Sequence, residues 1–264
     1  MPIIHPLNRL PVHIDEIRTR EHPVQVLRDD LLPGGSKQRA ATPYLKVLLD
    51  KGFHRFVYAS PFCGFAQVAL AVASNELGAE CTIYCEEDKS AQVPGKLHPF
   101  AALASQHGAT VLLVETLEEA HDRATTHAKL SGSYAIPLGF GDSCFRKLFE
   151  TALADVWLEI QRRSVRPIQR VWVPVGSGTL ARCLRKVIDV ELCLVDVRVL
   201  PSEDPRLLEL KMLQNTTHFR SSELFNEPCQ TLPPIPSNLH YDAKLWRWIN
   251  EQSTAGDLWW NVSR

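Results

Sequence analysis

Val171-Trp172-Val173-Pro174-Val175-Gly176-Ser177-Gly178-Thr179-Leu180-Ala181-Arg182 is a strand-like run that passes through a glycine turn into the start of a helix. Such a turn can point backbone N–H groups and hydroxyls at an anion lying on the helix N-terminus. Two interpretations of the turn stay open: a phosphate site, or a tight connection that uses glycine for its dihedral angles. The Gly-x-Gly-x-x-Gly fingerprint is incomplete and no Gly-Lys-Ser/Thr follows, so neither a dinucleotide site nor a P-loop is indicated.

Outward from this stretch, short β-branched or aromatic runs alternate with longer amphipathic stretches, as in proteins whose helices cross over a mostly parallel sheet. The sequence therefore predicts an α/β fold of two lobes, each a mostly parallel twisted sheet flanked by helices. We expect a smaller lobe at 53–139 and a larger lobe formed by 1–52 and 140–264. Expected strands cover 55–59, 81–85, 110–114, 134–136, 170–174, 192–200 and 257–260. Expected helices cover 36–51, 64–77, 99–107, 117–130, 143–163, 178–188 and 242–251.

Two local expectations refine this scheme. Ser36 stands where it can cap the helix expected over 36–51, which an extended N-terminal segment precedes. The stretch 215–238 is rich in Thr, Ser, Asn and Pro and lacks periodicity, so we expect a loop or mobile cover there.

Composition and charge place few limits on the function. The 264 residues are 45% hydrophobic, with a formal net charge of −1, so no global charge favours nucleic acid or an anionic membrane. Met1-Pro2-Ile3-Ile4-His5-Pro6 lacks a basic region followed by a long apolar run, and no later stretch could span a bilayer. We therefore expect a cytoplasmic protein without a membrane partner.

The seven cysteines are an odd number scattered through apolar segments, which predicts reduced core residues rather than a disulfide framework. Cys81 and Cys85 are the closest pair, but they sit in a strand-like run without the turn that zinc sites use. The histidines form no His-Glu-x-x-His pattern, so no metal site is expected.

Lys37, in Pro33-Gly34-Gly35-Ser36-Lys37-Gln38-Arg39, can be an ordinary exposed lysine or an amine that binds an aldehyde cofactor. The positive end of a helix dipole disfavours an ammonium ion, whereas a nearby phosphate would favour it. A lysine and an anion-binding turn in one chain together suggest pyridoxal phosphate.

A family resemblance favours the second interpretation. Val26-Leu27-Arg28-Asp29-Asp30-Leu31-Leu32-Pro33-Gly34-Gly35-Ser36-Lys37-Gln38-Arg39 resembles the Arg-Asp-Asp-Leu...Gly-Gly-Asn-Lys-x-Arg segment of aminocyclopropane-carboxylate deaminase and D-cysteine desulfhydrase, which are tryptophan synthase β-like, fold-type II pyridoxal phosphate enzymes. Gly176-Ser177-Gly178-Thr179 resembles the phosphate loop of that family, shortened by one glycine from Gly-Ser-Gly-Gly-Thr. Weaker matches are Ile136-Pro137-Leu138-Gly139, Tyr241-Asp242-Ala243-Lys244 and Leu258-Trp259-Trp260-Asn261.

The resemblance implies that pyridoxal 5'-phosphate lies in the interlobe cleft, with the larger lobe binding it. Lys37 would form the internal aldimine and act as the catalytic residue. The phosphate would lie on Gly176, Ser177, Gly178 and Thr179. In the cofactor's presence an amino acid substrate loses a proton, a carboxylate or a β-substituent. A homodimer is also implied.

Two family motifs are changed. Ser60-Pro61-Phe62-Cys63-Gly64-Phe65-Ala66-Gln67 stands where relatives have a Ser-Asn-His or Gly-Asn-His-Gly helix start that contacts the ring oxygen. We expect Ser60 and Gly64 to line the cofactor and Gln67 and Tyr241 to contact substrate, while Phe62 and Phe65 pack inside the lobe. Val262-Ser263-Arg264 replaces a terminal Thr-Gly-Gly, which leaves Ser263 as the candidate partner of the pyridine nitrogen.

Three functional hypotheses follow. The first is a lyase, deaminase or decarboxylase of amino acid metabolism. The second is a decarboxylase or rearranging enzyme that acts on an amino acid attached to a DNA base during phage DNA modification, since the short chain permits an open cleft. It would be favoured by a basic stripe formed by Arg162, Arg163, Arg166, Arg170, Arg182, Arg185 and Lys186. The third is a degenerate relative with a binding or structural role.

Overall fold

The computed structural model describes residues 10–264 apart from residues 92 and 94. The first nine residues of the expected N-terminal segment lie outside the described part. The described residues divide into two compact units, a smaller one at 37–148 and a larger one formed by 10–36 and 149–264. Compared with the expected lobes, residues 37–52 and 140–148 fall in the smaller unit.

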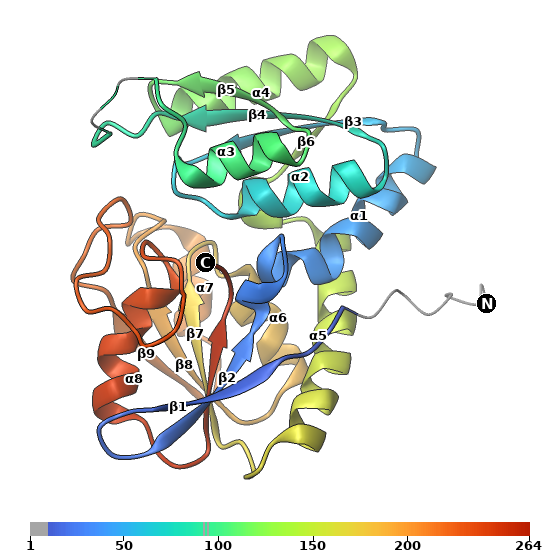
Figure 1. Cartoon of the computed structure of the whole chain (residues 1–264). Helices are drawn as coiled ribbons and strands as arrows, with labels where there is room; N and C mark the ends of the chain where they lie inside the picture. Colours follow the sequence, from blue (N-terminus) through green and yellow to red (C-terminus); the bar gives the residue numbers. More distant parts are fainter. Residues whose placement is uncertain (1–9, 92, 94) are drawn as a thin grey trace. The chain divides into compact units, whose positions relative to one another are not determined.

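The smaller unit is built on a parallel sheet with the strand order β5-β4-β3-β6. Its strands are β3 Arg55–Ser60, β4 Glu80–Glu86, β5 Thr110–Val114 and β6 Tyr134–Ile136. Its helices are α1 Gln38–Asp50, α2 Ala66–Glu76, α3 Pro99–Gln106, α4 Leu117–Ser131 and the 3-10 helix η3 Leu138–Phe140. Helices α2 and α3 cover one face of the sheet and α4 covers the other (Figure 1).

The larger unit is built on a sheet with the strand order β1-β2-β10-β7-β8-β9. Its strands are β1 Ile14–Arg18, β2 Pro23–Arg28, β7 Arg170–Val175, β8 Glu191–Asp196, β9 Thr216–Arg220 and β10 Asp257–Asn261. Only β1 runs antiparallel to its neighbour; the other five strands are parallel. Its helices are α6 Thr179–Val187, α7 Pro205–Lys211, α8 Trp246–Gln252 and the 3-10 helices η1 Asp29–Leu31 and η4 Asp242–Leu245. Helix α5 Ser143–Arg163 crosses the division between the units, and the 3-10 helix η2 Gly35–Lys37 ends at it.

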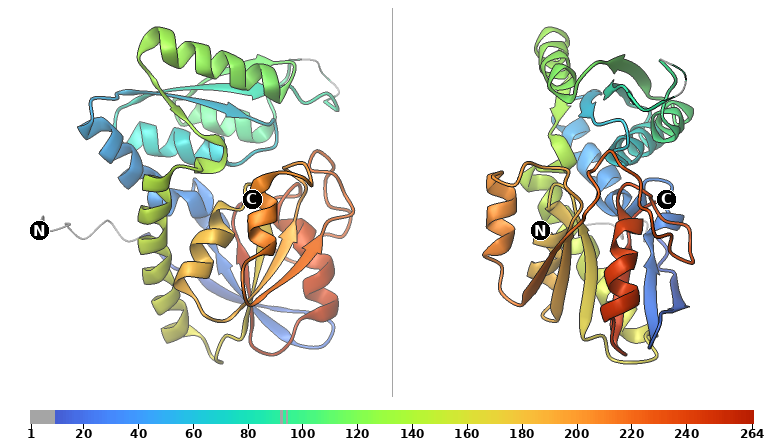
Figure 2. Two further views of the ribbon diagram at one scale, coloured as in Figure 1. Left: turned by 180° about the vertical axis from the view of Figure 1, so that it is seen from behind. Right: turned by 90° about the vertical axis from the view of Figure 1, so that its left-hand side faces the viewer.

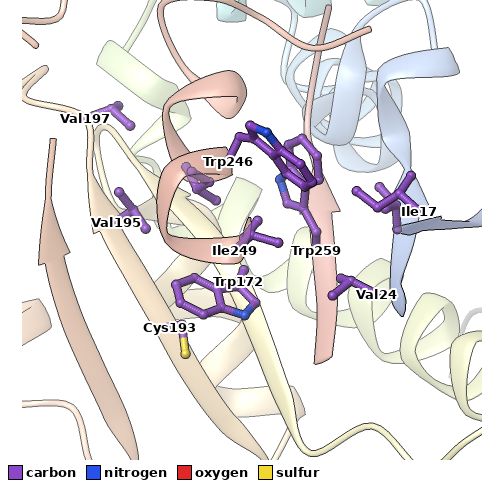
Figure 3. Close-up of a cluster of buried hydrophobic side chains, with 11 residues drawn as sticks. Ile17, Val24, Trp172, Cys193, Val195, Val197, Trp246, Ile249 and Trp259 are labelled. Carbon is purple, nitrogen blue, oxygen red and sulfur yellow. The ribbon is translucent and has the colours of Figure 1, made fainter. Parts of the chain in front are cut away.

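The core of the larger unit lies between the sheet and α8. Trp172, Trp259 and Trp246 are buried there, and the rings of Trp246 and Trp259 stack with centroids 6.3 Å apart (Figure 3). Helices α5 and α6 lie on the opposite side of the sheet (Figure 2). Successive residues of a strand face opposite sides of the sheet. In the central strands β7 and β10 nearly all residues are buried, so both faces of these strands are covered, as expected between two helix layers.

Most expected elements are present within two residues of their expected ends, so the predicted α/β class is confirmed. One expectation was wrong at 215–238, because Thr216–Arg220 forms β9. This strand pairs with β8 at the edge of the sheet and leaves polar side chains exposed, so it carries no apolar periodicity. Residues 221–238 contain turns and bends, as expected.

Ser36 does not cap α1, contrary to expectation. The capping position is Lys37, whose side chain makes no capping hydrogen bond, and η2 precedes the helix. The Ser36 hydroxyl instead bonds to Asp29, 2.6 Å away. Because its hydroxyl bonds to this buried carboxylate, Ser36 does not cap the backbone N–H groups at the start of α1.

The buried Asp257 carboxylate ties β10 to β7. It accepts hydrogen bonds from Trp172 Nε1 at 2.7 Å and from the Arg170 guanidinium at 2.8 and 2.9 Å. We expect Asp257→Ala to lower the free energy of unfolding by about 3–5 kcal/mol, because buried donors would lose their acceptor. Urea titration followed by circular dichroism measures the loss.

Glu159→Ala is the matched control, since Glu159 pairs with the largely exposed Arg162 and Arg163. Its expected cost is below about 1 kcal/mol. Equal losses in the two variants would contradict the role of burial.

Candidate cofactor site

Parallel pairing brings the two decisive sequence segments to one edge of the larger sheet. Strand β10 lies between β2 and β7, with Asn261 opposite Arg28 and Trp259 opposite Trp172. All three strands therefore end at nearly the same level. Ligands of parallel α/β sheets bind beyond the carboxyl ends of the strands. The segment that leads to Lys37 follows β2, and the 176–179 loop follows β7, only two strand spacings or about 10 Å away.

The glycine loop has the shape of an anion cradle. Gly178 adopts a φ of +75°, and a Cβ atom there would lie 2.6 Å from Leu210 Cδ1, so only glycine fits. Within the described residues, the backbone N–H groups of Ser177 and Gly178 have no hydrogen-bond acceptor. They stand at the N-terminus of α6, where the helix dipole favours negative charge.

Two hydroxyls and one guanidinium complete the loop. Ser177 Oγ lies 3.1 Å from Thr179 Oγ1. Arg182, one turn into α6, donates to the Ser177 carbonyl at 2.8 Å and to the Arg206 carbonyl at 3.3 Å. The arrangement supplies N–H donors, hydroxyl donors and a positive charge, and this donor set fits a phosphate group.

Lys37 is half-buried. The residue before it, Ser36, is held in the larger unit by several hydrogen bonds. The Ser36 N–H donates to the Val262 carbonyl at 3.1 Å. Trp260 Nε1 donates to both Ser36 Oγ at 3.0 Å and Asp29 Oδ2 at 3.1 Å. The Asp29–Ser36–Trp260 cluster therefore fixes the backbone from which Lys37 projects.

Tyr241 lies directly against the glycine loop. Its hydroxyl accepts a hydrogen bond from Gly176 N at 3.0 Å, and its ring fills the space that a Cβ on Gly176 would need. Burial, reinforced by the charge of Asp242, raises the pKa of Tyr241 above its ordinary value. The phenol therefore keeps its proton at neutral pH.

Asp242 is a buried carboxylate that the sequence analysis did not assign to the site. Its oxygens accept hydrogen bonds from Val262 N at 2.7 Å and from Ser263 N and Oγ at 3.1 Å each. Burial raises the pKa of Asp242 well above its usual range, against the effect of these three donors. Its place in the Tyr241-Asp242-Ala243-Lys244 match was the signal available in the sequence.

Ser263 was the candidate partner of the pyridine nitrogen. Its buried hydroxyl donates to Asp242 and lies 3.3 Å from Asn238 Nδ2, which donates to it. Both bonds hold the end of the chain after β10. Ser263 thus has a structural role within this cluster.

Three candidates remain, all in the smaller unit: Ser60 ends β3, Gly64 lies in the turn that follows, and Gln67 lies in the first turn of α2. Ser60 Oγ donates to the Pro61 carbonyl at 3.0 Å. Gln67 Nε2 donates to the Gly64 carbonyl at 2.9 Å, which ties this amide to its own turn. Phe62 packs edge-on against His98 and Phe65 against Phe100, as expected.

The cysteines behave as core residues. All seven are free thiols, and only Cys144 is not buried. Burial raises the pKa of Cys81, Cys85 and Cys193 to about 12. In the described residues, no group of three His, Cys, Asp or Glu side chains could hold a metal ion.

Most members of the expected basic stripe contact oxygen atoms of their own chain. Arg162 and Arg163 pair with Glu159, Arg170 with Asp257, and Lys186 with Glu150 at 3.2 Å. Arg182 and Arg185 donate to backbone carbonyls. These six side chains are therefore engaged within the protein, which does not favour a stripe offered to nucleic acid.

Two α/β units with mostly parallel sheets, one of which carries a glycine loop with donors for an anion after a central strand, are typical of α/β proteins that bind a cofactor. A family model described as pyridoxal-phosphate dependent enzyme matches residues 4–186, a range that includes Lys37 and the glycine loop. The chain belongs to this family, so it is a pyridoxal phosphate-dependent enzyme, and the family resemblance seen in the sequence is confirmed. No curated protein sequence matches the chain.

Solved structures share the fold at low sequence identity. Diaminopropionate ammonia lyase from Escherichia coli has a TM-score of 0.64 and 15% identity over 99% of this chain and 84% of that chain. An aminocyclopropane-carboxylate (ACC) deaminase homologue has a TM-score of 0.71 and 17% identity over 91% and 84%. O-ureido-L-serine synthase has a TM-score of 0.70 and 15% identity over 97% and 89%. None of the helices in the described part of the chain has the length and apolar character to cross a membrane.

We expect Asp29→Ala to lower the free energy of unfolding by about 2–3 kcal/mol, because Ser36 and Trp260 would lose a buried charged acceptor. Ser36→Ala should cost about 1 kcal/mol, since Trp260 Nε1 keeps Asp29. Urea titration followed by circular dichroism gives both values.

Asp15→Ala is the control, because Asp15 pairs with Arg28 while its own side chain is 50% exposed. Its expected cost is below about 1 kcal/mol. If Asp29→Ala costs no more than this control, the cluster does not anchor the segment before Lys37.

Proposed function

We propose that this enzyme uses pyridoxal phosphate bonded to Lys37 to break a bond in an amino acid, as a lyase, deaminase or decarboxylase. The observation that carries the proposal is the shared sheet edge, where β10 lies between the strand before the Lys37 segment and the strand before the phosphate loop. One small molecule with an aldehyde and a phosphate matches these two kinds of group. The printed names of the similar structures, an ammonia lyase, a deaminase homologue and an O-ureido-L-serine synthase, support an amino acid substrate.

Each residue has a defined task in this proposal. Lys37 would hold the cofactor, because a neutral lysine amine is the group that can bond to an aldehyde with loss of one water. The N–H groups of Ser177 and Gly178 and the hydroxyls of Ser177 and Thr179 would hold the phosphate. When bound, the cofactor supplies an electron sink for the carbon whose bond breaks. The Lys37 amine would be the group that moves a proton at that carbon.

The proposal includes Ser60 and Gly64 as residues for the cofactor and Gln67 as a residue for the substrate. The support is the family resemblance of the turn after β3. Because Gln67 Nε2 is bonded within that turn, its side-chain position is fixed before any ligand binds. Such preorganisation suits a binding role.

An amino acid attached to a DNA base is the second candidate substrate. The charged residues considered for it do not favour it, because they are mostly paired within the protein. Adding free amino acids, and separately DNA with an amino-acid-modified base, to the loaded enzyme distinguishes the two. Reaction with only the modified DNA would replace the first proposal by the second.

The third hypothesis, a degenerate relative with a binding or structural role, is not favoured, because the chain belongs to a family of pyridoxal phosphate-dependent enzymes. Cytoplasmic location and a homodimer complete the proposal; the free thiols support the first, and light scattering tests the second.

Lys37→Ala should abolish the near-visible absorbance band that pyridoxal phosphate gives on binding to the wild-type protein, because the C=N bond cannot form. Borohydride reduction followed by peptide mass spectrometry should find the cofactor on Lys37 in the wild type. Lys46→Ala, which removes an exposed lysine of α1, is the matched control and should keep the band. A band that survives in Lys37→Ala would refute the assignment.

A further inference from the structure

The Tyr241 hydroxyl retains a hydrogen-bond donor at the phosphate loop. A phenol has one proton to donate and lone pairs that accept. Its bond with Gly176 N uses a lone pair, because the backbone N–H is the donor. Among the described residues, Tyr241 has no acceptor for its own proton.

The position of this donor is fixed from two sides. The Tyr241 backbone N–H donates to the Asn238 carbonyl at 3.0 Å, and the ring lies on Gly176 so closely that a Cβ there would be 2.8 Å from Cε2. The next residue, Asp242, is bonded to the end of β10. The hydroxyl is therefore held at the loop before any ligand binds, which lowers the entropic cost of binding.

The loop itself has fewer backbone N–H donors than the family pattern that it resembles. It has one glycine fewer than the Gly-Ser-Gly-Gly-Thr pattern it resembles, and so one backbone N–H fewer. The N–H of Gly176 is also engaged, because it donates to Tyr241. Neither the missing glycine nor Gly176 therefore offers a backbone N–H to a phosphate on this loop.

We propose that Tyr241 Oη donates a hydrogen bond to the phosphate of the cofactor and takes the place of the missing glycine N–H. The inference rests on the proposed function, because it requires the phosphate to lie on residues 176–179. It assigns Tyr241 to the cofactor phosphate rather than to the substrate. The raised pKa of Tyr241 supports it, since a phenolate could not donate and would repel a phosphate.

Tyr241→Phe keeps the ring on Gly176 and removes only the hydroxyl. Affinity is measured by titration with pyridoxal 5'-phosphate and, in parallel, with pyridoxal, which has no phosphate. We expect the Kd for pyridoxal 5'-phosphate to rise about tenfold or more, because a hydrogen bond to a charged group is lost. The Kd for pyridoxal should stay unchanged.

Tyr58→Phe is the matched control. Tyr58 is another buried tyrosine whose hydroxyl accepts a hydrogen bond from a glycine N–H, that of Gly139 at 3.2 Å, and it belongs to the smaller unit. Removing its hydroxyl should leave both affinities as in the wild type. Circular dichroism verifies that both variants are folded.

Two outcomes would overturn the inference. Unchanged or tighter binding of pyridoxal 5'-phosphate by Tyr241→Phe would mean that the phosphate does not use the hydroxyl or takes the freed Gly176 N–H instead. An equal loss of affinity for both ligands would mean that Tyr241 only supports the fold. Failure of the proposed function is distinct, because wild-type protein would then bind no cofactor, or Lys37→Ala would keep the absorbance band.

Discussion

The buried hydrogen bonds among Asp29, Ser36 and Trp260 are the constraint on which the arrangement of the larger unit's site depends. They join the segment after β2 to β10, the last strand of the chain, across more than 200 residues of sequence. All three side chains are almost fully excluded from water, so an unsatisfied partner would be costly. The residue before Lys37 therefore has one well-defined place at the carboxyl edge of the sheet, and the lysine starts from there.

Strand β10 makes this edge a single surface. It lies between β2 and β7 and runs parallel to both, so it joins the strand before the lysine segment to the strand before the glycine loop. Val262 and Ser263, which follow β10, are held by Asp242 and Asn238, and Tyr241 reaches the glycine loop. The C-terminal 30 residues thus connect the lysine segment to the phosphate loop, although neither of the motifs that indicated the cofactor lies within them.

Local patterns predicted the alternation of strands and helices and the two cofactor motifs, because periodicity and glycine turns are properties of neighbouring residues. Contacts between distant residues were not predictable in this way. Ser36 has the residue type of a helix cap, yet its hydroxyl bonds to Asp29 and Trp260. Strand β9 lacks an apolar pattern because it lies at the sheet edge. Tyr241 was expected at the substrate, whereas its position against Gly176 depends on how the end of the chain folds back.

Attachment of the cofactor has a firmer physical basis than any one reaction. The phosphate loop offers N–H groups, hydroxyls and a helix dipole, all from residues whose places are fixed by their own unit. The candidates for tuning the ring are different, because Ser263 already bonds to Asp242 and Asn238, and Ser60 bonds to the Pro61 carbonyl. Reaction type in this cofactor's chemistry is decided by the groups around the ring and by substrate orientation. This chain keeps the lysine and the glycine loop but differs from the family pattern at the turn after β3 and at Ser263. Its selectivity for one reaction therefore has to come from residues that differ from the family pattern.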